Sequence, residues 1–257
     1  MKLKKLNEDK KNMKLSFEIK DVDDAFVNAI RRTIIEEVPT LAIEDLEIKE
    51  NSSALYDEML ALRVGLTPIK TDLKSYRLPE NEDEFIERSA RCTLQFTLKA
   101  SKKGYVYAEE AQSKDTKCSF VYPKMPLVKL VAKQKLDIIM WAVMGQGKDH
   151  IKWCPGLAWY KQIADITVNN KKELVERFIS KYPPQIIEAG KISKEKILKN
   201  DLVDAVDGVC DELVKVNYSD KDYQFILESW GQLKCAEILN ESANILISKV
   251  EEMEALI

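Results

Sequence analysis

The residues from Gly145 to Cys154 contain the one pair of side chains, His150 and Cys154, that could be imagined as a catalytic thiol pair. They include the one histidine of the sequence, His150, which follows Lys148 and Asp149. A cysteine beside a histidine can act as a nucleophile when a third group orients the histidine. No such orienting group, and no loop that would stabilise an oxyanion, occurs at a recognisable spacing. A stand-alone thiol enzyme is therefore a poorly supported alternative, since a lone histidine near a tryptophan more often has a structural role.

Other catalytic and metal-binding patterns are missing as well. The run from Gly145 to Lys148 is too short for a phosphate-binding P-loop. No Asp-x-Asp-x-Asp cluster is present to hold the Mg²⁺ of a polymerase. The cysteines stand at positions 92, 118, 154, 210 and 235 without any C-x-x-C pair, a spacing that favours reduced thiols over disulfides or a local metal site. The sequence therefore predicts no catalytic residues and no bound metal.

The charge balance bears on nucleic acids and membranes. The 257 residues include 40 basic and 43 acidic side chains, a net charge of −3, whereas duplex-binding proteins usually carry a basic excess. The six lysines between Lys2 and Lys14 are interpreted as a solvated arm, and no direct sequence-specific DNA binding is expected. No stretch approaches the ~20 apolar residues that span a bilayer, and no signal-peptide core is evident. A cytoplasmic protein without a membrane segment is predicted.

The first elements follow from residue spacing. Alternating apolar residues predict a strand over 15–19, and a helix is expected from about Ala25. In that helix Phe26, Ile30 and Ile34 recur every four residues and are predicted to form one buried stripe. Pro39 ends the helix because it removes a backbone donor. A second strand is expected near 43–48.

The middle of the chain divides into two segments of different character. Residues 50–158 are rich in prolines and glycines and contain a strongly alternating strand at 92–98, which predicts an irregular β-rich insert. Another strand is expected at 159–168. Residues 169–221 are rich in lysine and glutamate, with helical patterns at 172–180 and 201–213. A final strand is predicted at 223–227.

The chain ends in an apolar pattern typical of a long helix. The repeating residues are spaced alternately by three and four, as in a coiled-coil seam: Ala236, Leu239, Ala243, Leu246, Val250, Met253 and Ile257. One interpretation is that this seam packs on the protein's own sheet. Because the seam is longer than one small sheet requires, we expect part of it to meet another chain.

Three segments together resemble the alpha and D subunits of cellular RNA polymerases. Residues 26–39 contain an asparagine three residues before a double arginine, and then Val38-Pro39. Residues 59–69 resemble the family's Ala-His-Arg and Gly-Leu-x-Pro stretch, with Leu62 in place of the histidine. Residues 125–130 and 145–153 are similar to further family segments and occur in the family's order. The resemblance covers most of the chain, and the insert of about 50 residues points to the archaeal D branch.

The resemblance implies an α+β fold of three parts. The first is a dimerisation domain of an antiparallel sheet with two helices, formed by residues 1–49, 159–170 and 222–257. The second is an inserted β-rich domain over residues 50–158. The third is a small ferredoxin-like domain over residues 171–221. In this family that third domain sometimes holds an iron–sulfur cluster, which needs closely spaced cysteines. Here it contains only Cys210, so the cluster is predicted to be absent.

The resemblance also implies a function, a scaffold that starts the assembly of a transcribing polymerase while other subunits catalyse nucleotidyl transfer. The expected partners are the small L subunit as heterodimer partner, the small N and P subunits, and the largest and second-largest catalytic subunits. The residues expected at the dimer interface are Phe26, Ile30, Ile34, Leu239, Ala243, Leu246, Val250 and Met253. The residues expected to contact the large subunits are Asn28, Arg31, Arg32, Arg63 and Lys152. Ordinary solvated charges are the alternative for the arginines, and an unrelated interaction module is an alternative for the whole chain.

Overall fold

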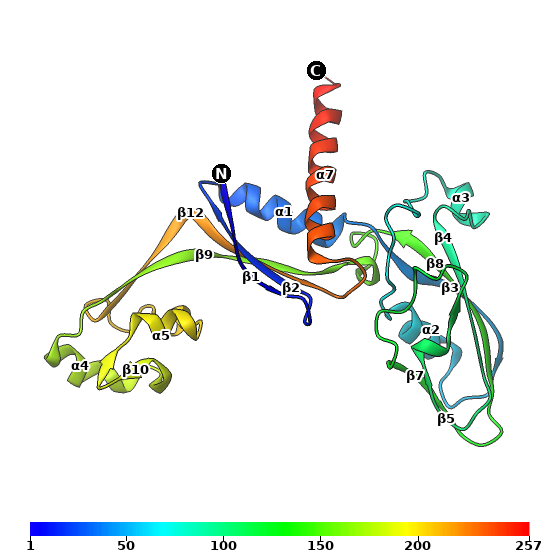
Figure 1. Cartoon of the computed structure of the whole chain (residues 1–257), viewed down its shortest axis with the longest axis horizontal. Coiled ribbons are helices and arrows are strands. Elements are labelled where there is room, and N and C mark those ends of the chain that lie inside the picture. The colour runs from blue at the N-terminus through cyan, green and yellow to red at the C-terminus, as the bar shows by residue number, and fades with distance from the viewer. Residues whose placement is uncertain (257) are drawn as a thin grey trace. The chain divides into compact units, whose positions relative to one another are not determined.

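The computed structural model describes residues 1–256, with the backbone alone at Glu82. The chain forms two compact units (Figure 1). The first comprises Met1–Lys4, Glu18–Asp24 and Tyr160–Phe225, and the second comprises Lys5–Phe17, Ala25–Trp159 and Ile226–Ile257. Ile257, the last residue of the predicted seam, lies outside the described residues. In the described part of the chain, no helix is long and apolar enough to cross a membrane.

Four strands form one sheet in the order β1-β2-β12-β9. They are β1 (Lys2–Asp9), β2 (Lys14–Lys20), β9 (Gly156–Val168) and β12 (Val214–Ser229). The predictions of strands at 15–19 and 159–168 are confirmed. The predicted N-terminal arm is wrong in that most of it forms the edge strand β1, although its side chains are exposed as expected. The strand predicted at 223–227 begins nine residues earlier. Val214, Val216 and Tyr218 alternate at its start, but the polar residues 219–222 separate them from the predicted segment.

The second unit contains the helices α1 (Asp24–Glu36) and α7 (Cys235–Glu254). Only the first residue of α1, Asp24, is assigned to the first unit. Both were predicted from their spacing. α7 follows a turn in which Gly231 has a φ of +94° and in which an added Cβ would lie 2.4 Å from Val121. The Ser229 hydroxyl donates to the carbonyl of Leu233 and accepts the Gly231 N–H across this turn. In Figure 1, α7 stands out from the unit at its C-terminal half.

The rest of the second unit is built on a four-stranded sheet in the order β3-β8-β4-β6. Its elements are β3 (Thr40–Asn51), α2 (Asp57–Gly65), α3 (Glu82–Ile86), β4 (Thr93–Ala100), β5 (Gly104–Tyr107), η1 (Ala108–Glu110), β6 (Gln112–Ser113), β7 (Pro126–Leu130), β8 (Leu136–Gly145) and η2 (Ile151–Trp153). β8 pairs antiparallel with both β3 and β4. The inward residues of β4, Leu94, Phe96 and Leu98, lie in the buried core of this sheet. The alternation at 92–98 therefore predicted this strand correctly.

The first unit contains the short elements between β9 and β12. They are α4 (Lys172–Phe178), η3 (Ile179–Lys181), η4 (Pro184–Ile186), β10 (Ile187–Glu188), β11 (Lys191–Ile192), α5 (Lys194–Lys199) and α6 (Val203–Val206). The helix predicted at 201–213 is wrong beyond Val206, because Gly208 adopts a φ of +70° and the chain turns there. The helix at α5 was not predicted.

Candidate subunit interface

Two faces of α7 differ sharply in exposure. Ile238 and Ser242 are buried within the chain, and Lys249 on the same side forms a 2.5 Å ion pair with Glu37. Residues of the predicted seam lie elsewhere on the helix: Leu239 and Leu246 are half-buried, whereas Ala236, Ala243, Val250 and Met253 are exposed. The chain thus covers a stripe beside the seam and leaves the seam itself largely open.

Three large apolar side chains in the C-terminal half of α7 are uncovered. Ile247, Val250 and Met253 are 56%, 55% and 65% exposed. Single exposed apolar residues are normal on soluble proteins, but a contiguous apolar stripe marks an interaction site. A second helix that lays its own apolar stripe here would cover these side chains by coiled-coil packing.

The buried side of helix α1 differs from the predicted one. Val27 and Ile34 are fully buried, Ile30 is half-buried and Phe26 is 42% exposed. The prediction that Phe26 belongs to the buried stripe is therefore wrong for the chain taken alone. Spacing placed Phe26 on the apolar side of the helix, but its neighbour Val27 points into the core. Phe26 remains available at the surface, whereas Ile34 is covered by the chain itself.

The polar face of α1 holds the double arginine. Arg31 donates from Nε and Nη2 to the Asn28 side-chain oxygen at 3.1 and 2.8 Å. Arg32 forms an exposed ion pair with Glu36 one turn further on, and this hydrogen bond holds the pKa of Glu36 below its usual value. Both arginines thus have partners within their own helix. An exposed i,i+4 pair of this kind stabilises a helix by only about 0.3–0.5 kcal/mol.

Arg63 and Lys152 make bonds inside the chain that the sequence did not reveal. The Arg63 guanidinium donates to the carbonyls of Pro126 and Leu127 at 2.8 and 2.9 Å. It therefore links α2 to β7, which are two of the segments that carry the family resemblance. The Lys152 ammonium donates to the Ile43 carbonyl at 3.1 Å and pairs with the Glu44 carboxylate.

The Gly-Gln-Gly-Lys segment closes the C-terminal end of α1. The Gln146 side-chain amide donates to the Glu37 carbonyl at 2.7 Å, and the Lys148 N–H donates to the Glu36 carbonyl at 2.9 Å. The last carbonyls of a helix lack partners within it, so these bonds satisfy them. Gly147 must lack a side chain, because a Cβ would lie 1.9 Å from the Ile35 carbonyl oxygen. This segment therefore has a structural role at the end of α1.

The cysteines and the histidine are engaged in local structure. The Cys154 thiol donates to the Gly156 carbonyl at 3.0 Å, and His150 Nδ1 accepts the backbone N–H of Lys152. Burial raises the pKa of Cys154 and raises that of Cys118 to about 11, which keeps both thiols protonated and unreactive. Within residues 1–256, no three side chains of His, Cys, Asp or Glu gather in a way that would hold a metal ion. The predicted absence of an iron–sulfur cluster stays a prediction.

Known proteins match this chain over nearly its whole length. The family described as the RNA polymerase Rpb3/Rpb11 dimerisation domain matches residues 16–250. A DNA-directed RNA polymerase subunit Rpo3 from Methanosarcina acetivorans is 37% identical over 249 residues, which cover 94% of this chain and 93% of that protein. The subunit of the same name from Pyrococcus furiosus is 31% identical over 261 residues, which cover 95% of this chain and 92% of that protein. This chain therefore belongs to the RNA polymerase Rpb3/Rpb11 dimerisation-domain family.

Proposed function

We propose that this chain is a non-catalytic assembly subunit of an archaeal-type DNA-dependent RNA polymerase. Relatives that carry the name of a polymerase subunit cover nearly all of the chain. The stand-alone thiol enzyme is not favoured, because burial raises the pKa values of Cys118 and Cys154 and His150 accepts a backbone N–H. The proposal includes a cytoplasmic location, where such a polymerase transcribes the genome.

We further propose that the chain forms a heterodimer with the small L subunit through α1 and α7. The single observation that supports this pairing best is the uncovered apolar stripe of α7, in a chain whose family is defined by a dimerisation domain. In this proposal the exposed seam residues of α7 and Phe26 of α1 contact the partner helices. The two helix pairs then stack as a four-helix interface.

The remaining contacts and the domain division belong to the same proposal. The N and P subunits and the two large catalytic subunits are the further partners, with Asn28 and the double arginine facing the large subunits. The dimerisation domain comprises residues 1–49, 159–170 and 222–257, which flank the β-rich insert at 50–158 and the ferredoxin-like insert at 171–221. The Arg63 and Lys152 side chains donate hydrogen bonds to carbonyls within the chain. Their proposed role is therefore to position the backbone of the surface that contacts the large subunits, as well as to lie at its edge.

Co-expression with the L subunit of the same organism tests the proposal. Size-exclusion chromatography is expected to show a stable 1:1 complex with L, and self-association or poor solubility for the chain alone. A chain that elutes as a soluble monomer and forms no complex with L would overturn the proposed pairing. Alkylation of the native chain adds a second readout, since a stand-alone thiol enzyme requires one hyper-reactive cysteine.

A further inference from the structure

The second half of α7 has little packing against the rest of the chain. Ile238 and Ser242 in the first half are buried, whereas none of residues 243–254 is buried and only Ile245 and Leu246 are half-buried. This half extends about 18 Å, at about 1.5 Å of rise per residue. A helix with so few buried contacts changes its direction easily unless another contact fixes it.

One ion pair joins this half of α7 to the rest of the second unit. Lys249 Nζ lies 2.5 Å from Glu37 Oε1, directly after the end of α1. The Glu37 side chain is only 19% exposed, so water can replace this partner only in part. Within residues 1–256, no other side chain of 243–254 makes an ion pair or a hydrogen bond with another element. The pair is therefore the polar contact through which the chain can orient this half of the helix.

The charges around the pair make the lysine difficult to replace. Lys249 is the one basic residue of α7, which also contains five glutamates. α1 has no basic residue in its last turn, and the carbonyl end of a helix carries a partial negative charge. Glu36 at that end already pairs with Arg32. Without Lys249, the acidic second half of α7 and the acidic end of α1 would repel each other.

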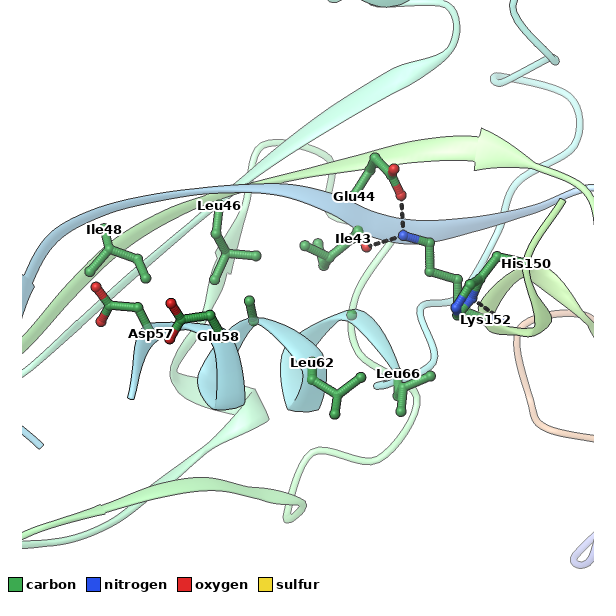
Figure 2. A pocket seen from close by; sticks show the side chains of 12 residues that line it. Ile43, Glu44, Leu46, Ile48, Asp57, Glu58, Leu62, Leu66, His150 and Lys152 are labelled. Atoms are coloured by element: carbon green, nitrogen blue, oxygen red, sulfur yellow. Dashed lines mark hydrogen bonds and ion pairs between the residues drawn. The ribbon is translucent and has the colours of Figure 1, made fainter. Parts of the chain in front are cut away.

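Glu37 is held by a loop that is itself fixed at its far end. The Glu37 carbonyl accepts the Gln146 side-chain amide at 2.7 Å. The same loop leads into η2, where the Lys152 ammonium binds the Ile43 carbonyl and the Glu44 carboxylate (Figure 2). Because Glu37 is fixed in this way, the ion pair sets the position of Lys249 and of the helix that carries it.

We propose that Glu37 and Lys249 are positioning residues for subunit pairing, which set the direction of the second half of α7 before the partner binds. This half carries the exposed apolar side chains of Ile247, Val250 and Met253. A stripe that is already held in its bound direction loses less conformational freedom on binding, and this raises affinity. The inference rests on the proposed function, since it concerns the pairing with L. It adds a role for two charged residues that do not belong to the apolar seam.

Competition for a limiting amount of L tests this role. The wild-type chain and a variant, each with its own tag, are co-expressed with L, and the share of each in the L-bound fraction is measured. Lys249→Met and Glu37→Gln should each be under-represented about fivefold, the upper range for an exposed ion pair. Lys99→Met breaks an exposed ion pair with Asp137 in the same unit. This matched control should compete as well as the wild type.

A charge swap separates positioning from direct contact with L. Glu37→Lys combined with Lys249→Glu should recover most of the lost competition, because an ion pair is kept at the same place, and so should Lys249→Arg. Undiminished competition by Lys249→Met and Glu37→Gln would overturn the inference. Failure of the charge swap would overturn it too, as would a loss confined to Lys249→Met, since the lysine would then contact L itself. A wild-type chain that L does not retain in the absence of a competitor would instead refute the proposed function.

A distance measurement reports the direction of the helix itself. Spin labels on p-acetylphenylalanine at Ser248 and Lys49, both exposed in the second unit, avoid the native cysteines. Dipolar spectroscopy of the labelled chain, diluted with unlabelled chain, should give a broader distance distribution for Lys249→Met than for the wild type. Circular dichroism should show the same helix content in both. An unchanged distribution would overturn the inference, even if L binding were weaker.

Discussion

Helix α7 and the segment between β9 and β12 use their apolar residues in opposite ways. In that segment Ile186, Ile197 and Val206 are completely buried, although no helix there is longer than seven residues. α7 is 20 residues long and regular, yet it leaves Val250 and Met253 more than half exposed. The small elements thus form a core that is complete within the chain. The long helix carries an apolar stripe whose cover must come from outside it.

The largest expected effect is the loss of pairing when a charge enters the α7 stripe. Leu246→Asp or Val250→Asp would bury an unpaired carboxylate in the proposed interface, at a cost of several kcal/mol. Co-purification with L should collapse, while circular dichroism of the chain stays native because Val250 is exposed in it. Ser248→Asp, at an exposed position of the same helix, is the control. Normal co-purification of both seam variants would remove α7 from the interface.

The complementary change creates a cavity in the core formed by the segment between β9 and β12. Ile186→Ala removes a fully buried side chain and should destabilise the first unit by about 2–5 kcal/mol. Limited proteolysis and urea denaturation should detect early opening of residues 171–213, whereas binding to L should persist. Leu198→Ala, at a position that is 50% exposed, should change stability far less. If Ile186→Ala abolished L binding, the folding of this core and the pairing through α7 would not be independent.

Helix α1 presents a third situation, a polar face whose charges already have partners. Arg31→Ala combined with Arg32→Ala breaks only bonds within the helix, so the chain's own stability should change by less than about 1 kcal/mol. Loss of the proposed contact to a large subunit should weaken assembly by about 2–5 kcal/mol. Reconstitution with L and then with the second-largest subunit separates the two effects. Glu36→Gln controls for the lost ion pair, and full-strength assembly would leave the arginines as ordinary surface charges.

The smallest expected effect is that of an iron chelator, which should leave the melting temperature of the protein unchanged. Residues 171–221 contain one cysteine, Cys210, whereas a four-iron cluster normally needs four thiolates. Their buried apolar residues are expected to hold this segment without a cluster. Protein purified without oxygen should be colourless, should contain no stoichiometric iron, and should keep its melting temperature with a chelator. Three or four irons per chain would contradict this prediction. The core of the first unit would then not be complete within the chain, because a bound cluster would contribute to it.

Periodicity identified several elements in which one face of the segment is apolar. The alternation at 92–98 predicted β4, and the three-four spacing after Cys235 predicted α7. It failed at β1, whose exposed residues carry no alternating apolar pattern. It also missed the start of β12, where the polar residues 219–222 separate two alternating stretches. It also failed beyond Val206, where a turn at Gly208 interrupts a helix-like pattern.

The sequence by itself determined that apolar stripes exist on α1 and α7 and which family motifs the chain contains. Only the tertiary structure decided which of these side chains the chain covers. Val27 is buried while Phe26 is open, and Arg63 and Lys152 bind carbonyls far along the chain. The outward leucines of α2 likewise became an exposed surface only when Leu60 and Val64 took the core side. The physical reason is that spacing fixes the side of an element on which a residue lies, whereas burial depends on neighbours that are distant in sequence.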